Sequence, residues 1–136
     1  MNILFEKNRL TPEDYIALRP EIPIGTARKA IDGSSMTLRA VADGETVGML
    51  RVLSDGAMFC YIQDVFVFEN YRGQGLGRAL LEQAMCSMGE LLEMGEYMLV
   101  TLLADPGMEE FYEHMGFMRA PNALAGHAMQ CILQKD

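Results

Sequence analysis

A glycine-rich turn that leads from an apolar segment straight into a helix constrains the fold of this chain more than any other feature. Residues 65–77 read Val-Phe-Val-Phe-Glu-Asn-Tyr-Arg-Gly-Gln-Gly-Leu-Gly, and we expect a buried strand to end and a helix to begin within them. Glycines allow left-handed backbone angles and leave no side chain between the amides and a ligand. The segment therefore predicts a strand, an anion-binding loop and a helix in series.

We expect this loop to bind a diphosphate. The amides of residues 74–78 would face the ligand, and Arg72 or Arg78 would add a full positive charge. A turn that only lets a strand enter a helix has a similar composition, because short glycine patterns are common.

Two other phosphate loops are excluded. A nucleotide-hydrolase loop needs Lys and then Ser or Thr after its last glycine, whereas Arg78 and Ala79 follow Gly77. A dinucleotide-binding fold places its glycines after the first strand of its repeat.

Length, composition and net charge limit the class of protein. With 136 residues and 50% hydrophobic content, we expect a single domain over residues 1–136. No segment approaches the ~20 apolar residues of a membrane span, and the first residues do not resemble a secretion signal, so we expect a cytoplasmic protein without a membrane partner. Three scattered cysteines and two histidines argue against disulfides and metal sites. A net charge of −8 argues against a nucleic-acid partner.

The spacing of apolar residues and turn signals predicts an α+β fold. The dipeptide at residues 43–44, Asp-Gly, favours a tight hairpin turn between two strands, and the strand that follows the glycine-loop helix is placed to pair in parallel with the strand before it. We expect a mixed, mostly antiparallel twisted sheet of six to seven strands flanked by about four helices. The expected strands are residues 1–6, 36–42, 46–53, 59–68 and 97–103 with a closing pair at 117–119 and 126–133, and the helices run from 11 to near 20, from 26, from 75 to about 93, and from 108 to 115.

Two motifs together resemble the GNAT superfamily of acyl-CoA-dependent N-acyltransferases. The phosphate signature of that family is Arg or Gln, two residues, Gly, one residue, then Gly or Ala, and Arg72, Gly75 and Gly77 match it. The later family motif is an aromatic-Tyr pair followed by Gly-Phe at the end of a short helix, and residues 111–117 match it. The order of the elements agrees along essentially the whole chain.

The resemblance is closer to one subgroup of the superfamily. Residues 61–65, Tyr-Ile-Gln-Asp-Val, and Pro121-Asn122 are similar to short bacterial single-domain members. The acceptors of this subgroup are mostly unassigned, so the resemblance does not identify a substrate.

The resemblance implies an acetyl-CoA-dependent enzyme that acetylates a small primary amine or an amino-acid-like acceptor by direct transfer in a ternary complex. In this family the strand before the glycine loop holds the pantetheine arm through its backbone, here Val65, Phe66 and Val67. The amide of Val67 would polarise the thioester carbonyl and stabilise the developing oxyanion. Tyr112 would protonate the departing thiolate, because an ordinary phenol pKa of about 10 keeps it protonated at neutral pH.

The residues do not decide which group is the general base that takes the proton of the amine. The family base often is a carboxylate on the strand face that carries Tyr61 and Gln63, and neither position is acidic here, so a water chain is one option. Strict alternation places residues 65 and 67 on that same face and Asp64 on the opposite one. Asp64 is the nearest carboxylate, either as a base or as a structural residue bonded to a loop amide. Asp105 stands where many members carry an asparagine that contacts the pantetheine arm.

Two other functions are compatible with the same residues. The missing strand carboxylate favours a catalytically weak acetyl-CoA-binding sensor or interaction module, and acetylation of proteins or peptides is a further alternative. In the family the acceptor pocket is built largely by the first two helices and their link, here residues 15–31, together with the tail. Glu21 and Asp32 could hold a cation, but no specificity residue stands out. Pairing of two copies through the C-terminal strands is one option. Residues expected at the cofactor are Val65, Phe66, Val67, Arg72, Gly73, Gln74, Gly75, Leu76, Gly77, Arg78, Asp105 and Tyr112.

Overall fold

The structure, a computed structural model, describes residues 2–135 of the 136-residue chain. The chain forms two compact units, Met1–Leu102 and Leu103–Asp136. The first unit contains the whole sheet and three α-helices, and the second contains one short helix.

The first unit is built on a five-stranded sheet with the order β1-β2-β3-β4-β5. Neighbouring strands from β1 to β4 are antiparallel, whereas β5 runs parallel to β4. This arrangement confirms the mixed, mostly antiparallel sheet and the α+β class. The strands are β1 (Ile3–Lys7), β2 (Met36–Ala42), β3 (Glu45–Ser54), β4 (Phe59–Val67) and β5 (Leu99–Thr101).

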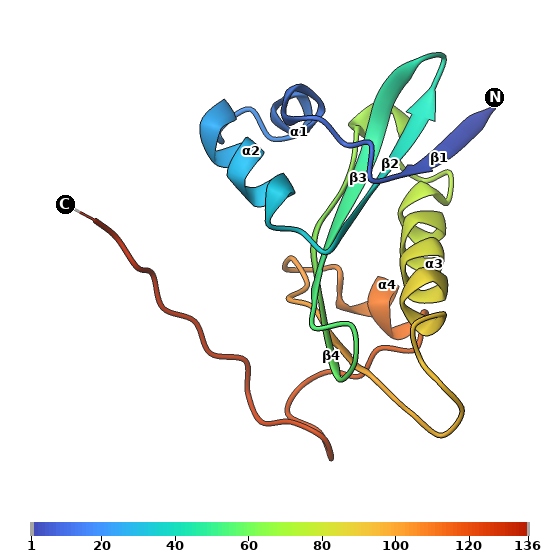
Figure 1. Cartoon of the computed structure of the whole chain (residues 1–136), viewed down its shortest axis with the longest axis vertical. Coiled ribbons are helices and arrows are strands. Elements are labelled where there is room, and N and C mark those ends of the chain that lie inside the picture. Colours follow the sequence, from blue (N-terminus) through green and yellow to red (C-terminus); the bar gives the residue numbers. More distant parts are fainter. Residues whose placement is uncertain (1, 136) are drawn as a thin grey trace. The chain divides into compact units, whose positions relative to one another are not determined.

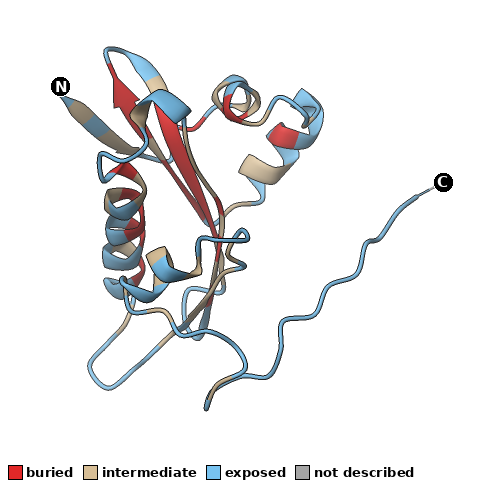
Figure 2. Ribbon diagram, turned by 180° about the vertical axis from the view of Figure 1, so that it is seen from behind, coloured by how far each residue is buried: buried red, intermediate tan, exposed pale blue. Residues whose placement is uncertain are grey.

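Helices cover both faces of this sheet (Figure 1). On one face lie α1 (Pro12–Leu18) and α2 (Ile24–Asp32), and on the other lies α3 (Leu76–Gly89). Figure 2 shows the buried residues along the strands and on the side of α3 that faces them. The core under α1 and α2 consists of Leu10, Tyr15, Leu18, Ala27 and Met49.

Local sequence signals explain where these elements begin. The Thr11 hydroxyl accepts a hydrogen bond from the Asp14 amide at 3.0 Å, and the Asp14 carboxylate accepts one from the Thr11 amide at 3.1 Å. This capping box starts α1 at the predicted residue. The second helix begins at Ile24 rather than near residue 26, because Pro23 takes the N-cap position in extended conformation. Asp43 and the glycine after it have φ values of 50° and 80°, as the predicted hairpin turn requires.

Gly48 brings β4 and α3 close to β3. A Cβ at this position would lie 3.1 Å from the Phe66 carbonyl oxygen and 3.4 Å from Cδ1 of Leu80. The missing side chain therefore lets the first turns of α3 pack over β3 and β4. This contact holds the glycine loop at the end of β4.

Replacing Gly48 by alanine should destabilise the fold. The added methyl group meets backbone on one side and a buried leucine on the other, so we expect a loss of about 1–3 kcal/mol in the free energy of unfolding. Gly89→Ala is the matched control, because a Cβ there meets no atom within 4 Å and alanine favours the helix. Thermal unfolding of both variants tests the contact, and an unchanged midpoint for Gly48→Ala would contradict it.

The second unit contains α4 (Glu109–Glu113). Gly116, at φ 97°, ends this helix as the sequence predicts. Its amide donates to the Glu113 carbonyl at 3.0 Å, and the Phe117 amide donates to the Tyr112 carbonyl at 3.1 Å.

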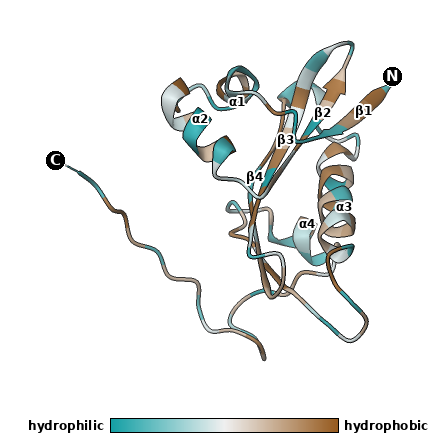
Figure 3. Cartoon of the chain, in the orientation of Figure 1, coloured by the Kyte–Doolittle hydropathy of each residue, from teal (hydrophilic) through white to brown (hydrophobic). Residues whose placement is uncertain are grey.

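The predicted closing strands at 117–119 and 126–133 are wrong for this structure. The described residues beyond α4 contain no strand, so the sheet has five strands rather than six or seven. The turn at Asn122 does form, since its side chain accepts from the amides of Leu124 and Ala125. Residues 123–135 are exposed (Figure 2) and alternate between apolar and polar stretches (Figure 3). Apolar alternation alone does not make a strand, because a strand also needs a paired backbone.

Two other elements are shorter than expected. The helix after the glycine loop ends at Gly89 rather than near residue 93, and β5 spans only Leu99–Thr101. No helix within residues 2–135 has the length and apolar character needed to cross a membrane.

Candidate functional site

The glycine loop offers unpaired amides at the start of α3. A short 3-10 helix (Glu69–Tyr71) follows β4, and then Gly73 and Gly75 adopt φ values of 76° and 81°. The Ala79 amide makes the first intrahelical bond, 3.0 Å from the Gly75 carbonyl oxygen, so the three amides of residues 76–78 precede it. A Cβ on either glycine would meet no protein atom within 4 Å. The first turn carries no acidic side chain, and the loop fits a diphosphate.

The two arginines of the loop have different roles. The Arg72 Nε donates to the Val67 carbonyl at 2.9 Å and so ties the loop to the end of β4. The Arg78 Nε contacts Glu82 at 2.8 Å in a pair whose side chains are both more than half exposed. Such exposed pairs contribute little stability, so Arg78 can exchange this partner for a phosphate. Arg72 acts first as a structural tie, which the sequence did not predict.

Two neighbouring positions complete the loop. The Gln74 side chain donates to the Asn70 carbonyl at 3.4 Å, within the loop itself. Leu76 is buried and anchors the first turn of α3 in the core. The loop conformation is thus fixed by its own side chains as well as by its glycines.

The edge of β4 beyond Tyr61, where the pantetheine arm is expected, is open in the sense that no strand of the described residues pairs with it. β5 pairs with β4 only along Phe59–Tyr61. The Phe68 amide donates to the Val47 carbonyl at 2.8 Å, and the alternation of an antiparallel ladder therefore turns the Val67 amide away from β3, toward this edge. The backbone of Val67 lies where a thioester carbonyl could accept its hydrogen bond.

A β-bulge at Asp64 overturns the strict alternation predicted for β4. Asp64 has a positive φ of 56°, and the register with β3 shifts between Met49 and Arg51. Gln63 pairs with Arg51 and Phe66 pairs with Met49, so both lie on the face covered by α1 and α2. The extra residue reverses the faces beyond it. Val67 therefore lies on the α3 face rather than with Gln63.

The Asp64 carboxylate is the centre of a buried polar network beneath α1. Its side chain is 2% exposed. Oδ2 accepts from the Tyr15 hydroxyl at 2.7 Å and from the Arg51 Nε at 2.8 Å, and Oδ1 accepts from the Arg19 Nη1 at 2.7 Å. These bonds join α1, β3 and β4 at the bulge.

These partners set the protonation of Asp64. Burial alone would raise its pKa, but the hydrogen bonds from Tyr15, Arg51 and Arg19 outweigh it and hold the pKa below the ordinary value. Burial and the same carboxylate raise the pKa of Tyr15. A carboxylate with a lowered pKa and occupied oxygens is a poor proton acceptor. Of the two roles expected for Asp64, these contacts favour the structural one, although its partners are side chains rather than a loop amide.

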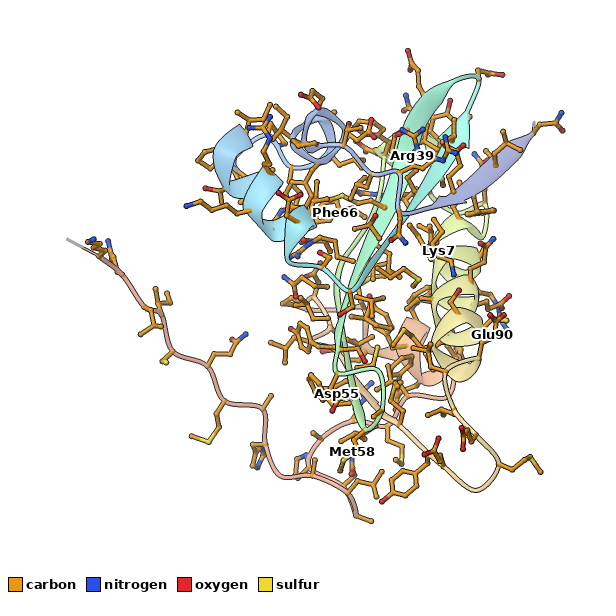
Figure 4. All side chains as sticks on the ribbon, in the orientation of Figure 1. Lys7, Arg39, Asp55, Met58, Phe66 and Glu90 are labelled. Atoms are coloured by element: carbon orange, nitrogen blue, oxygen red, sulfur yellow. The ribbon has the colours of Figure 1, made fainter. Side chains whose placement is uncertain are left out.

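The network extends to the end of α2 and to the surface. Arg51 Nη1 donates to the Ala30 carbonyl and to the Ser34 hydroxyl, both at 3.1 Å. The Arg19 guanidinium lies 5.7 Å from the centre of the Phe66 ring, and Figure 4 shows Phe66 on the side of the sheet that faces α1 and α2. Sequence reasoning missed both arginines. Arg51 gave a usable signal, because a charge inside an apolar strand needs a buried partner.

Tyr112 lies on α4 in the second unit. Its ring packs edge to face against Phe111 at 5.0 Å and Phe117 at 5.9 Å between ring centres. Partial burial, together with the charge of Asp105, raises the pKa of Tyr112 above the ordinary value. The hydroxyl is therefore protonated at neutral pH, as a general acid requires. The Asp105 carbonyl accepts from the Met108 amide at 2.9 Å and starts the turn before α4.

The sequence matches a family model over residues 33–119, described as "Acetyltransferase (GNAT) domain". The chain belongs to the GNAT acetyltransferase family. The matched range includes the bulge, the unpaired edge of β4, the glycine loop and α4. The GNAT resemblance drawn from the motifs at residues 72–77 and 111–117 is thereby confirmed.

Relatives and solved structures agree with this family. An uncharacterized N-acetyltransferase of Gracilaria tenuistipitata var. liui, ycf52, is 31% identical over 108 residues, which cover 76% of this chain and 57% of that protein. The histone acetyltransferase TAP1 of Glycine max is 39% identical over 80 residues, 59% of this chain and 33% of that protein. The chain spans only part of the length of either relative. A GNAT-family acetyltransferase of Streptococcus pneumoniae TIGR4 has the same fold, with a TM-score of 0.81, 24% identity and coverage of 98% and 100% of the two chains.

Replacing Tyr15 by phenylalanine should destabilise the protein and change how its stability depends on pH. The substitution keeps the ring but removes the 2.7 Å bond to Asp64, a charge-assisted bond worth about 2 kcal/mol. A carboxylate with a lowered native pKa adds stability above its unfolded pKa, about 3.9, and loses it as the pH falls through the native value. The deficit of Tyr15→Phe should therefore be full at pH 7 and shrink below about pH 4.

Denaturant unfolding across this pH range measures the effect. Tyr97→Phe is the control, because Tyr97 is 84% exposed. Equal stability of Tyr15→Phe and the wild type at pH 7 would show that Asp64 does not depend on the Tyr15 hydroxyl.

Proposed function

We propose that this chain transfers the acetyl group of acetyl-CoA directly to a small primary amine or an amino-acid-like acceptor in a ternary complex. Membership of the GNAT family supports acetyl transfer. The observation that carries the proposal is the pair of backbone donor groups in the first unit, the amides of residues 76–78 and the Val67 amide at the open edge of β4. One group suits a diphosphate, and the other suits a thioester carbonyl.

Each donor has a separate task in this proposal. The amides at the start of α3 bind the diphosphate, and Arg78 adds charge after releasing Glu82. The backbone from Val65 to Val67 holds the pantetheine arm. Acetyl-CoA supplies a thioester, whose carbonyl the acceptor amine attacks. The Val67 amide then stabilises the charge that develops on that carbonyl oxygen without having to reorient.

The proton transfers follow from the groups that remain available. As the new C–N bond forms and the C–S bond breaks, Tyr112 donates its proton to the departing sulfur. The amine must lose a proton too, and Asp64 is occupied by three donors. Tyr61 and Gln63 stand on the strand face where the family often carries a carboxylate base, and neither is acidic. Water therefore accepts that proton. Alkaline pH then favours the reaction, because the free amine is the nucleophile.

A thiol-release assay with acetyl-CoA and a panel of amines tests the proposal. Thiol release that depends on an amine supports an enzyme. Tight binding of acetyl-CoA without release on any amine or peptide would leave the binding module expected from the missing strand carboxylate. Peptides belong in the panel because one relative is named a histone acetyltransferase, which favours a protein lysine as the second candidate acceptor.

Gly75→Asn should weaken acetyl-CoA binding without a matching loss of fold. Asparagine tolerates the left-handed backbone better than other residues, but its side chain would stand in the open space before the amides. We expect the dissociation constant to rise about tenfold or more, the equivalent of one charge-assisted hydrogen bond. Gly44→Asn is the matched control at φ 80° in the β2–β3 turn. Equal affinities of the two variants by calorimetry would count against the diphosphate site.

Tyr112→Phe should reduce turnover much more than cofactor affinity. Loss of a general acid lowers kcat by about 100-fold, while the phenylalanine ring keeps the packing against Phe111 and Phe117. The Michaelis constant for acetyl-CoA should stay nearly constant. Steady-state kinetics beside the exposed Tyr97→Phe control measures both constants, and undiminished turnover would remove Tyr112 from this role.

A further inference from the structure

We propose that Arg19 binds a carboxylate of the acceptor, which takes the place that the Glu21 side chain occupies in this structure. The inference rests on the proposed function and names its acceptor class, amines that carry a carboxylate. It follows from the two sides of the Arg19 guanidinium: one side is fixed by Asp64, and the other side contacts only an exchangeable partner, Glu21.

The inner side of Arg19 is fixed. Its Nη1 donates to the Asp64 Oδ1 at 2.7 Å, and that carboxylate is 2% exposed. The guanidinium also lies over the Phe66 ring at 5.7 Å. A guanidinium held in this way is ordered before a ligand arrives, so binding costs little conformational entropy.

The outer edge of Arg19 is available for exchange. Its Nε and Nη2 lie 3.0 Å and 2.9 Å from a single oxygen of Glu21. The Glu21 side chain is 59% exposed and stands in the turn between α1 and α2. A pair with one largely exposed partner is easily exchanged, whereas the two N–H groups form a fork that matches both oxygens of a carboxylate. Glu21 therefore acts as a replaceable internal ligand.

The charges and the position of Arg19 suit an anionic acceptor. Two arginines, Arg19 and Arg51, meet one buried carboxylate at Asp64, which leaves one positive charge for a partner outside the core. Phe66 directly precedes Val67, the proposed oxyanion donor, and its ring lies on the face opposite α3. An acceptor bound at Arg19 would thus approach the open edge of β4 from the side of α1 and α2.

A different assignment follows if Glu21 itself binds the acceptor. The sequence suggested that Glu21 could hold a cation, and in the structure the cation it holds is Arg19. An ammonium group bound by Glu21 would give a preference for amines with two positive charges. The two assignments predict opposite effects of removing the Glu21 charge.

The test compares kcat/KM for L-amino acids and for the corresponding L-amino-acid amides, which differ in the carboxylate. Glu21→Gln should raise kcat/KM for amino acids about two- to fivefold, because it removes the competing carboxylate, and leave the amides unchanged. Arg19→Lys should lower kcat/KM for amino acids about tenfold or more, through loss of the fork, with little change for the amides. Arg9→Gln, at an exposed arginine before α1, should change kcat/KM for neither substrate.

Several outcomes would overturn the assignment. A loss on both substrates in Glu21→Gln would make Glu21 the ligand of the acceptor amine, and a parallel loss on both in Arg19→Lys would leave Arg19 a structural role only. If the wild type binds acetyl-CoA but acetylates no amine, the proposed function fails separately. Calorimetry with N-acetyl-amino acids and the CoA-loaded protein then tests Arg19. Weaker binding by Arg19→Lys than by the wild type supports the site. Equal binding by the two proteins, or no binding by the wild type, overturns it.

Discussion

A carboxylate removed from water at a bulge in β4 must find hydrogen-bond donors, and Asp64 finds them on two arginines and one tyrosine of the first unit. Breaking a buried ion pair is costly because the remaining charge stays desolvated. The network therefore fixes α1 and β3 against β4 at one point, and it holds a non-glycine residue at φ 56°. The same bulge decides which side chains of β4 face α1 and α2 and which face α3.

In the proposed function, the bulge and the glycine loop divide the tasks of acetyl transfer between the two faces of the sheet. On the α3 face, Gly48 allows the helix to pack closely, and Arg72 ties the loop to the Val67 carbonyl, so backbone donors gather near the end of β4. On the other face, Arg19 is ordered by Asp64 and Phe66. In the proposed site the side chains are mainly supports and the main-chain amides are the donors, which would explain why its motif is rich in glycine.

Local signals predicted much of this architecture. The helix start at residue 11, the hairpin turn at residues 43–44 and the helix end near residue 115 each depend on a few adjacent residues, and all three are present. Long-range partners were not predictable in this way. The faces of β4 beyond Gln63 depend on a bulge stabilised by residues 13 and 45 positions away. The closing strands failed because pairing, unlike apolar alternation, is not encoded within a single segment.

The proposed function depends most on the binding of a diphosphate by main-chain amides. Calorimetric titration of the wild-type protein with CoA and with pantetheine, which lacks the diphosphate and the nucleotide, tests it most directly. We expect saturable heat with one CoA per chain and binding of pantetheine weaker by orders of magnitude. Equal affinity for the two ligands, or no heat with CoA from protein that unfolds cooperatively, would contradict it.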